Sequence, residues 1–264
     1  MAVKSLNVLP FLYAMGLSML PHLPNQFTAL VTGASGGIGN AFVKHLLSLP
    51  QTGHIFAVSR QPLLLQDERL TQVDLDVSQE EDRRALARKL NNVPVHLFFN
   101  AIGVLHDASQ GLKPEKRLDR LTLEGLSQVM QTNAFIPALL ISAIQSSLQG
   151  SHPSIIASLS ARVGSISDNH LGGWYSYRAS KAAHNMLMKT TAIELSRLNK
   201  QSIVLCLHPG TTDTPLSQPF QTRVPNGKLF TPEFVASQLI DVMAKRTPDD
   251  TGSFWDWAGE PIEW

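Results

Sequence analysis

The sequence is poor in cysteine and carries almost no net charge. Cys206 is its only cysteine, so an internal disulfide framework is excluded and a reducing compartment is indicated. This residue lies in the apolar run 203–207, which predicts a buried and unreactive thiol. The formal charge of +1 leaves no basic excess to neutralise phosphates, so we expect no nucleic-acid partner.

Several catalytic and metal-binding signatures are also missing. The nine histidines are scattered, with no H-E-x-x-H pattern and no paired cysteines, so no metal site is predicted. The G-x-S-x-G signature of hydrolases is absent as well. The length of 264 residues, 43% of them hydrophobic, favours one globular α/β domain. We expect the protein to be cytoplasmic.

No apolar run is long enough to span a membrane, but one lies near the start of the chain. Residues 6–20 follow Lys4 and have the outline of a short signal peptide. Pro10 interrupts them, no small-x-small cleavage site follows, and stable membrane insertion is not expected. We predict an N-terminal extension over 1–25, frayed or docked, and a folded domain over 26–264. There are two alternatives for residues 1–25. They could have a targeting or membrane-surface role, or they could result from an upstream start codon that is not the natural one.

From Phe27 onward, short β-rich runs alternate with amphipathic segments, which predicts right-handed βαβ units and a mostly parallel sheet. Strands are expected over 27–31, 55–59, 70–73, 95–99, 154–159 and 203–207. Helices are expected over 39–49, 78–90, 122–148, 177–198 and 232–245. The helix caps are predicted at Ser78 (with Glu81 closing a capping box), Thr122 and Thr231.

Two irregular segments, 103–120 and 215–230, follow predicted strand ends. In α/β sheets ligands bind at the carboxyl ends of the strands, so these segments are candidate walls of a pocket as well as ordinary surface loops.

A glycine-rich turn joins the first strand to the first helix. Glycine there lets the main chain approach a pyrophosphate, while the helix start offers free N–H groups. A tight turn without a ligand is the competing interpretation. The predicted cofactor contacts in this turn are Gly33, Ser35, Gly36, Gly37 and Ile38.

The end of the second strand distinguishes the two nicotinamide cofactors. An acidic residue there would bind the ribose 2′-hydroxyl, whereas an arginine accommodates a 2′-phosphate. Arg60 occupies this place and no carboxylate does, so NADP(H) is preferred over NAD(H). Asp76 and Val77, just past the third strand, are predicted beside the adenine, although Asp76 could equally be a helix-leading acid.

Tyr177 and Lys181 lie four residues apart on a predicted helix, so their side chains share one face. A phenol is a poor acid–base catalyst at neutral pH, and a nearby ammonium is expected to lower its pKa. Lys181 could also hold the ribose of a nicotinamide. By itself a Y-x-x-x-K pair is common, and the pair gains meaning from the glycine turn on the same chain.

These motifs together resemble the short-chain dehydrogenase/reductase family. They comprise TGxxxGxG, an N-A-x-G strand end, a helix asparagine, Y-x-x-x-K and P-G-x-x-x-T. The runs 160–165 and 172–181 are most similar to the branch of C-factor proteins and sniffer-type carbonyl reductases. The resemblance covers about residue 27 to the C-terminus. It implies a single-domain Rossmann fold, a doubly wound sheet of about seven strands flanked by helices, hydride transfer between nicotinamide and a carbonyl or alcohol, and a homodimer or homotetramer.

The resemblance also implies roles for individual residues. Tyr177 would be the general acid for carbonyl reduction, Lys181 would lower its pKa and bind ribose, and Asn133 would hold a water in a proton relay behind Lys181. Further cofactor contacts are implied for Asn100, Ala101, Gly103, Pro209, Gly210, Thr212 and Thr214.

The chain departs from the family pattern at two places. The strand end 99–103 reads F-N-A-I-G where N-N-A-G is common, which loosens the contacts assigned there. The catalytic serine is usually the second of a Ser-Ser pair, and this chain has Ser160-Ala161. A hydroxyl must still donate to the developing alkoxide, so we assign it to Ser160, with Ser165 as the alternative.

These observations predict an oxidoreductase that passes hydride from NADPH to a small, apolar carbonyl compound. A nucleotide-binding signalling protein of the C-factor type, in which turnover is secondary, is the first alternative. A nucleotide-dependent epimerase using the same tyrosine and lysine is the second, but it would need a larger substrate domain for which this chain has no room.

Overall fold

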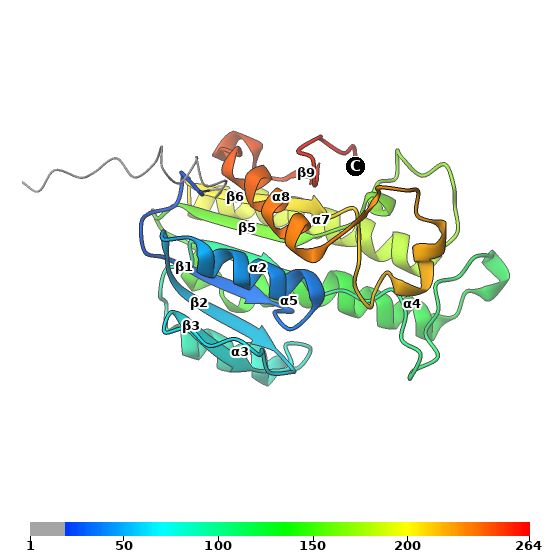
Figure 1. Ribbon diagram of the computed structural model, residues 1–264, viewed down its shortest axis with the longest axis horizontal. Helices are drawn as coiled ribbons and strands as arrows, with labels where there is room; N and C mark the ends of the chain where they lie inside the picture. The colour runs from blue at the N-terminus through cyan, green and yellow to red at the C-terminus, as the bar shows by residue number, and fades with distance from the viewer. Residues whose placement is uncertain (1–18) are drawn as a thin grey trace, which may run out of the picture.

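Seven strands form one parallel sheet at the centre of the computed structural model, which describes residues 19–264 (Figure 1). Their order, β3-β2-β1-β4-β5-β6-β9, reverses direction between β1 and β4, which confirms the predicted doubly wound topology. The strands are β1 Phe27–Thr32, β2 Thr52–Ser59, β3 Leu70–Asp74, β4 Leu97–Asn100, β5 Ser154–Leu159, β6 Ser202–His208 and β9 Ser253–Asp256.

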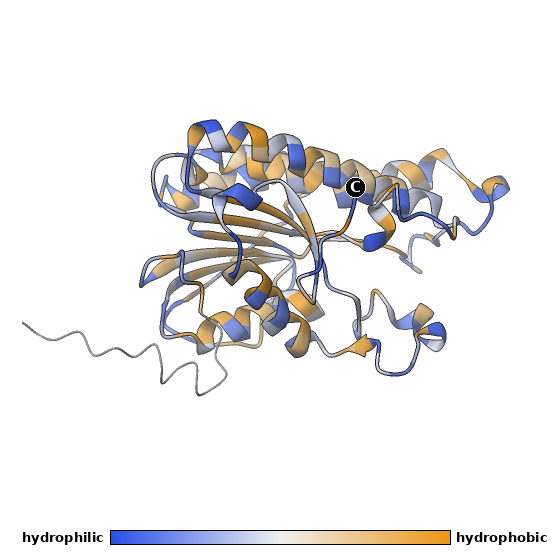
Figure 2. Ribbon diagram, turned by 90° about the horizontal axis from the view of Figure 1, so that it is seen from above, coloured by the Kyte–Doolittle hydropathy of each residue, from blue (hydrophilic) through white to orange (hydrophobic). Residues whose placement is uncertain are grey.

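Helices cover both faces of this sheet. α2 (Gly37–Ser48) and α8 (Pro232–Ala244) pack together on one face, and the opposite face carries α3 (Glu80–Leu90), α5 (Ile136–Ala143) and α7 (Tyr175–Leu198). Successive residues of β1 show why both faces are apolar: Ala29 and Val31 enter the core below α2 and α8, while Leu30 enters the other core. Figure 2 shows the hydrophobic strands lying between the two helical layers.

The strand at one edge of the sheet was not predicted from the sequence. β9 pairs with β6, placing Phe254 opposite Cys206, and the ring of Trp264 stacks on Phe254 at 5.6 Å between centroids. Phe254 and Trp255 lie in β9 and therefore form part of this edge of the sheet. Their run is too short, and too close to turns, to show a clear strand period.

The helix predicted over 122–148 is interrupted twice, so this prediction is wrong in its continuity. Thr122 caps α4 (Leu123–Met130) as predicted, accepting from Gly125 N–H. A π-helical turn, Gln131–Phe135, then precedes α5, and a break at Ile144 separates α5 from α6 (Gln145–Leu148). Pro137 explains the π-turn, because it has no N–H for the carbonyl four residues earlier.

The capping box predicted at Ser78 does not form. The main-chain N–H of Ser78 donates to Oδ1 of Asp76 at 3.0 Å, and α3 begins only at Glu80, without a side-chain cap. This local hydrogen bond to the Asp76 carboxylate stabilises a turn that keeps Ser78 outside the helix. The cap predicted at the start of α8 is confirmed, because Oγ1 of Thr231 accepts from Phe234 N–H.

The described part of the N-terminal extension is docked on the domain. Leu20 and Leu23 are buried in the core beneath α2 and α8. The Gln51 amide binds both, accepting from Leu20 N–H and donating to the carbonyls of Leu20 and Leu23. The rest of the apolar stretch 6–20 lies outside the described residues. Among residues 19–264, no helix has both the length and the apolarity needed to cross a membrane.

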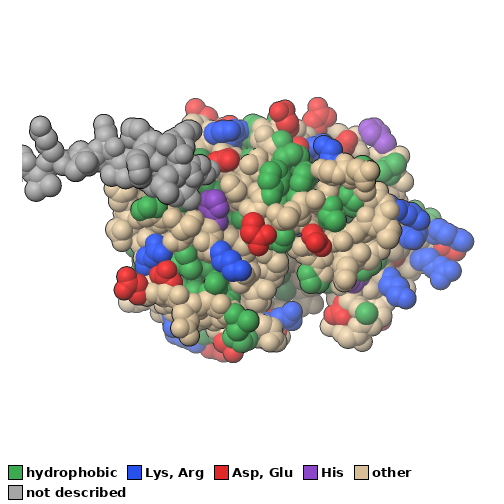
Figure 3. All heavy atoms as spheres, in the orientation of Figure 1, with side chains coloured by type: hydrophobic (Ala, Val, Ile, Leu, Met, Phe, Trp, Pro, Cys, Tyr) green, Lys and Arg blue, Asp and Glu red, His purple; other side chains and the backbone are tan. Residues whose placement is uncertain are grey.

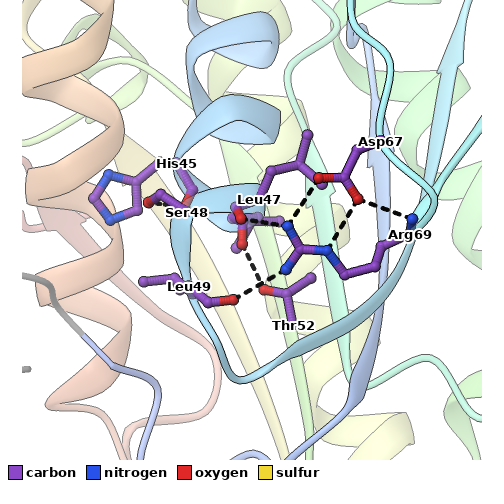
Figure 4. A network of polar contacts seen from close by, with 8 residues as sticks. His45, Leu47, Ser48, Leu49, Thr52, Asp67 and Arg69 are labelled. Carbon is purple, nitrogen blue, oxygen red and sulfur yellow. Dashed lines mark hydrogen bonds and ion pairs between the residues drawn. The ribbon is translucent and has the colours of Figure 1, made fainter.

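An arginine ties the C-terminal end of α2 to the loop before β3. The guanidinium of Arg69 binds both carboxylate oxygens of Asp67 and donates to the carbonyls of Leu47 and Leu49 (Figure 4). The carbonyl of Leu47 belongs to the last turn of α2, where no helical N–H remains to bind it, and Leu49 directly follows the helix. The far end of α2 is thereby fixed, while its first turn faces the site described next.

Candidate active site

The glycine turn lies at the point where the strand order reverses, between the ends of β1 and β4. Gly33 has φ +70°, and a Cβ on it would lie 2.9 Å from the main-chain carbon of Ala101. Only glycine allows both the left-handed conformation and this close approach of two main chains. The turn is thus held against the segment 101–103 that follows β4.

The first turn of α2 is free to bind an anion. Its cap, Gly36, has no side chain, no side-chain hydrogen bond reaches the cap, and the first turn contains no acidic residue. A Cβ on Gly37 would lie 2.6 Å from Cγ2 of Thr214, so the loop after β6 closes directly over this turn. Free N–H groups at a helix start, in a cradle that side chains would fill, fit the pyrophosphate of a dinucleotide.

A cavity of about 1060 Å³ opens from this turn across the carboxyl ends of the strands. Both irregular segments singled out in the sequence line it, as expected for pocket walls. Of the predicted site residues, it brings together Ser35, Gly36, Gly37, Ile38, Ala101, Gly103, Ser160, Tyr177, Lys181, Pro209, Gly210, Thr212 and Thr214.

Tyr177 and Lys181 lie on the face of α7 that borders the cavity. Both are more than nine-tenths buried. The Lys181 ammonium donates to the carbonyl of Leu159, at the end of β5, at 2.9 Å, and lies 5.9 Å from the centre of the Tyr177 ring. The strand end thus fixes the lysine beside the phenol. Sequence spacing places the two on one helix face, but it does not reveal this carbonyl.

Burial governs the acid–base properties of the pair. It lowers the pKa of Lys181 to about 8, and it raises the pKa of Tyr177 above its ordinary value. The expectation that Lys181 lowers the pKa of Tyr177 is therefore wrong for this state of the chain. The cost of burying a phenolate exceeds the attraction of an ammonium 5.9 Å from the ring centre. Tyr177 consequently keeps its proton at neutral pH.

The two candidate serines differ in their surroundings. Ser160 lines the cavity, and its hydroxyl donates to Oδ1 of Asn185 on α7 at 2.6 Å. Ser165 is buried outside the cavity lining, where its Oγ accepts from Asp168 N–H. Ala161, at the position of the family's usual serine, lines the cavity and packs in the same apolar cluster as Tyr177. Ser160 is the candidate with access to a substrate.

The side chain of Asn133 is fully occupied by the protein. Its amide binds both main-chain groups of Val104, at 2.7 and 2.8 Å, and donates to Oγ of Ser180 at 3.0 Å. The main-chain carbonyl of Asn133 is a further acceptor to which a water could bind. That carbonyl lacks the usual helical partner, because residue 137 is a proline.

Several predicted cofactor residues lie outside the cavity lining. Asn100 links three strand ends, accepting from Thr32 Oγ1 and donating to Ser158 Oγ. Gly33 underlies the turn described above. Three further residues, predicted around the adenine and its ribose, also lie outside the lining. Arg60 is exposed and directly follows β2, and Asp76 and Val77 follow β3, so all three lie at the carboxyl ends of these strands.

The contact between Trp174 and Phe220 and the burial of His184 were not found from the sequence. Trp174 and Phe220, from distant segments, pack at 5.1 Å between ring centres, and Trp174 meets Tyr177 edge-on at 6.1 Å. His184, one turn beyond Lys181, is buried with neither ring nitrogen hydrogen-bonded, and burial lowers its pKa to about 3. Neither feature has a local sequence signal. The ring contact joins residues 46 positions apart, and the state of His184 depends on how deeply its side chain is buried.

Comparison with known proteins gives consistent matches. A family model described as short chain dehydrogenase matches residues 27–224. A 1-hydroxy-2-glutathionyl-2-methyl-3-butene dehydrogenase from Rhodococcus sp. (strain AD45) is 30% identical over 90% of this chain and 99% of its own. C-signal from Myxococcus xanthus is 28% identical over 69% and 99%. The structure of an NADPH-bound carbonyl reductase from chicken fatty liver is 26% identical, with a TM-score of 0.79 over 96% and 98%.

Proposed function

This chain belongs to the short chain dehydrogenase family, and from that premise we propose that it is an NADP(H)-dependent carbonyl reductase with Tyr177 as its general acid. The resemblance to the branch of C-factor proteins and carbonyl reductases is confirmed by C-signal and the chicken enzyme. Membership makes the chain an oxidoreductase. Membership alone assigns neither the cofactor preference nor the catalytic residues.

One observation carries the proposal: Tyr177 and Lys181 lie together at a cavity that also contains the free first turn of α2. A dinucleotide anchored at that turn can extend along the cavity toward the tyrosine. When bound, the nicotinamide supplies hydride to a carbonyl carbon or accepts it from an alcohol carbon. The family and the geometry thus support the same reaction.

The chain's own residues would handle the proton. Tyr177 keeps its proton because burial raises its pKa, so it can donate to the carbonyl oxygen as the carbon is reduced. The Lys181 ammonium, held by Leu159, favours the phenolate left behind and can replenish the proton through a water at the carbonyl of Asn133. Ser160 would donate to the same oxygen after its hydroxyl turns from Asn185 toward the cavity.

The preference for NADP(H) rests on Arg60. It directly follows β2, where a ribose 2′-phosphate is expected, and its exposed side chain is free to bind one. Its charge is unpaired among the described residues, because no carboxylate lies within ion-pair distance. The chicken carbonyl reductase is described as NADPH-bound, which supports the same choice.

The decisive experiment measures the oxidation of NADPH and NADH in parallel against a panel of aldehydes and ketones. We expect turnover with NADPH to exceed turnover with NADH, and Tyr177→Phe to abolish it while retaining NADPH binding. Equal rates with NADH would refute the cofactor assignment. Full activity of Tyr177→Phe would refute the catalytic one.

The similarity to C-signal supports one alternative, a signalling protein in which cofactor binding matters and turnover does not. The same substitution separates the two functions. Unchanged biological output of Tyr177→Phe, together with abolished NADPH oxidation, would favour the signalling role.

We also propose a homodimer or homotetramer. Apolar side chains are exposed on neighbouring helices of one face: Phe135 at the end of the π-helical turn, Leu139 on α5, and Met186 and Ile193 on α7. Sedimentation analysis tests this, and a monomer at micromolar concentration would refute it.

A further inference from the structure

The cavity concentrates positive charge in a chain that has almost none overall. Its lining includes six cations but only one carboxylate, that of Asp168, while the whole chain has 22 basic and 21 acidic residues. The six cations are Lys116, Arg162, Arg178, Lys181, Arg223 and Lys228. Such a local excess raises the concentration of anions at the mouth of a cleft.

Three of these charges already have partners inside the protein. Arg162 forms ion pairs with Asp168 and Asp256, at 3.5 and 3.1 Å. Arg178 donates to the carbonyls of residues 163, 172 and 173, which fixes the loop before α7. Lys181 belongs to the catalytic pair. Among the described residues no hydrogen-bonding or ion-pair partner is found for the side chains of Lys116, Arg223 and Lys228, so these charges remain available.

Two of the available cations belong to segments that border the aromatic pair of Trp174 and Phe220, and both line the cavity. Lys116 adjoins the segment before α7, because its main-chain oxygen is 3.8 Å from where a Cβ on Gly173 would lie. The main-chain carbonyl of the preceding residue, Glu115, accepts from Trp174 N–H. Arg223 closes the short 3-10 helix Gln218–Arg223, three residues after Phe220. Residues three apart on a 3-10 helix project from the same side, so Arg223 lies on the side that presents Phe220 to Trp174.

The wall between Tyr177 and these cations is apolar. Tyr177 meets Trp174, Trp174 meets Phe220, and Leu105 and Leu216 pack in or against the same cluster. The loops that carry Lys116 and Arg223 project at one end of the molecule (Figure 1), and Figure 3 shows lysine and arginine side chains gathered at that end. The site therefore offers a proton donor, then an apolar wall, then two unpaired cations.

We propose that the physiological substrate is a carbonyl compound with an apolar body and a carboxylate at its far end. This inference rests on the proposed reductase function. The carbonyl would lie at Tyr177, the body against Trp174 and Phe220, and the carboxylate between Lys116 and Arg223. It adds an anionic end to the small, apolar carbonyl compound expected from the sequence.

The phosphates of the cofactor do not account for these two cations. The pyrophosphate is assigned to the first turn of α2, and the 2′-phosphate to Arg60 after β2. Lys116, by contrast, is tied to the segment that carries Trp174, on the side of Tyr177 where a substrate must enter.

The test compares matched acids and esters. The substrates are 4-acetylbenzoate and 4-(4-acetylphenyl)butanoate, each against its methyl ester, with NADPH saturating. We expect kcat/KM for the longer acid to exceed that for its ester at least tenfold, and the preference to shrink as ionic strength rises. The double variant Lys116→Gln/Arg223→Gln should reduce the acid-to-ester ratio by about tenfold or more, as expected for the loss of charge-assisted hydrogen bonds.

The neighbouring Arg117→Gln is the matched control, because Arg117 is exposed, pairs with Asp119 and does not line the cavity. It should leave the acid-to-ester ratio unchanged. Equal use of acid and ester by the wild type would overturn the inference, as would a double variant whose only defect is a raised KM for NADPH.

A binding measurement separates this inference from the proposed function. Calorimetry with 4-phenylbutanoate, which has no reducible carbonyl, reports the carboxylate site without turnover. Tighter binding of this acid than of its methyl ester to the wild type, lost in the double variant, would support the inference even if no ketone were reduced. Equal binding of acid and ester would overturn it while leaving the reductase function intact.

Discussion

The hydroxyl of Ser160 donates to Oδ1 of Asn185 at 2.6 Å, with both side chains buried at the end of β5. In this arrangement the hydroxyl proton points toward α7 and away from any substrate. In the proposed reaction Ser160 would exchange this bond for one to the substrate oxygen, because Ala161 occupies the family's usual serine position. The strength of its present bond would then add to the barrier of that reaction.

Removing this hydroxyl tests the assignment. We expect Ser160→Ala to lower kcat for ketone reduction by about 10²- to 10³-fold, the usual effect of losing a donor to a developing oxyanion. Ser165→Ala, an equally buried serine outside the cavity, should change kcat far less. Steady-state kinetics with NADPH make the comparison, and a larger loss in Ser165→Ala would reverse the assignment.

Replacing Arg60 tests the cofactor preference. Arg60→Gln should raise KM for NADPH about tenfold or more and leave KM for NADH unaltered, because only the former has a 2′-phosphate to bind. Lys89→Gln, which removes an exposed charge from the last turn of α3, is the control. Equal changes with both cofactors would assign Arg60 no part in discrimination.

The contact between Gly37 and Thr214 gives a prediction with a built-in rescue. In Gly37→Ala the new methyl would meet Cγ2 of Thr214 at 2.6 Å, so we expect a loss of about 1–3 kcal/mol in unfolding free energy and weaker cofactor binding. Adding Thr214→Ser removes that methyl and keeps the hydroxyl, and should restore most of both. Urea unfolding and NADPH titration measure this. A double variant no better than Gly37→Ala would show that the clash lies elsewhere.

The pKa of Lys181 predicts a pH dependence of activity. Burial lowers this pKa to about 8, so the ammonium is present below that pH and is lost above it. Carbonyl reduction needs the charge and the proton, and kcat/KM should therefore fall as pH rises through about 8. A pH–rate profile with NADPH as the donor shows the effect. A profile that stays flat to pH 10 would mean that Lys181 remains protonated in the working enzyme or takes no part.

His184 predicts a pH dependence of stability. Its folded-state pKa lies near 3, below the value of about 6.5 in an unfolded chain, so the unfolded state binds more protons between these values. Stability should consequently fall as pH is lowered through this window. His184→Leu removes two unpartnered buried nitrogens and should stabilise the chain at pH 7 by about 1–3 kcal/mol, with a flatter pH dependence. The exposed His170→Leu is the control, and an unchanged or lower unfolding free energy in His184→Leu would contradict the prediction.

The sequence was sufficient where local chemistry and chain order agree. The alternation of strands with helices permits few topologies, so the predicted topology is confirmed, and the glycine turn lies between β1 and α2 as predicted. Local rules failed where a neighbour competed. The Asp76 carboxylate accepts the main-chain N–H of Ser78, and Pro137 leaves the carbonyl of Asn133 without its usual helical partner.

By itself, the sequence determined the fold class, the glycine turn and the shared helix face of Tyr177 and Lys181, because these follow from periods of two and about 3.6 residues along the chain. Only the tertiary structure decided that Ser160 is bound to Asn185, that β9 forms the sheet edge, and that Lys116 and Arg223 line one cavity. These relationships join segments 25 to more than 100 positions apart. Burial and hydrogen-bond partners at such separations are properties of packing, and no local pattern records them.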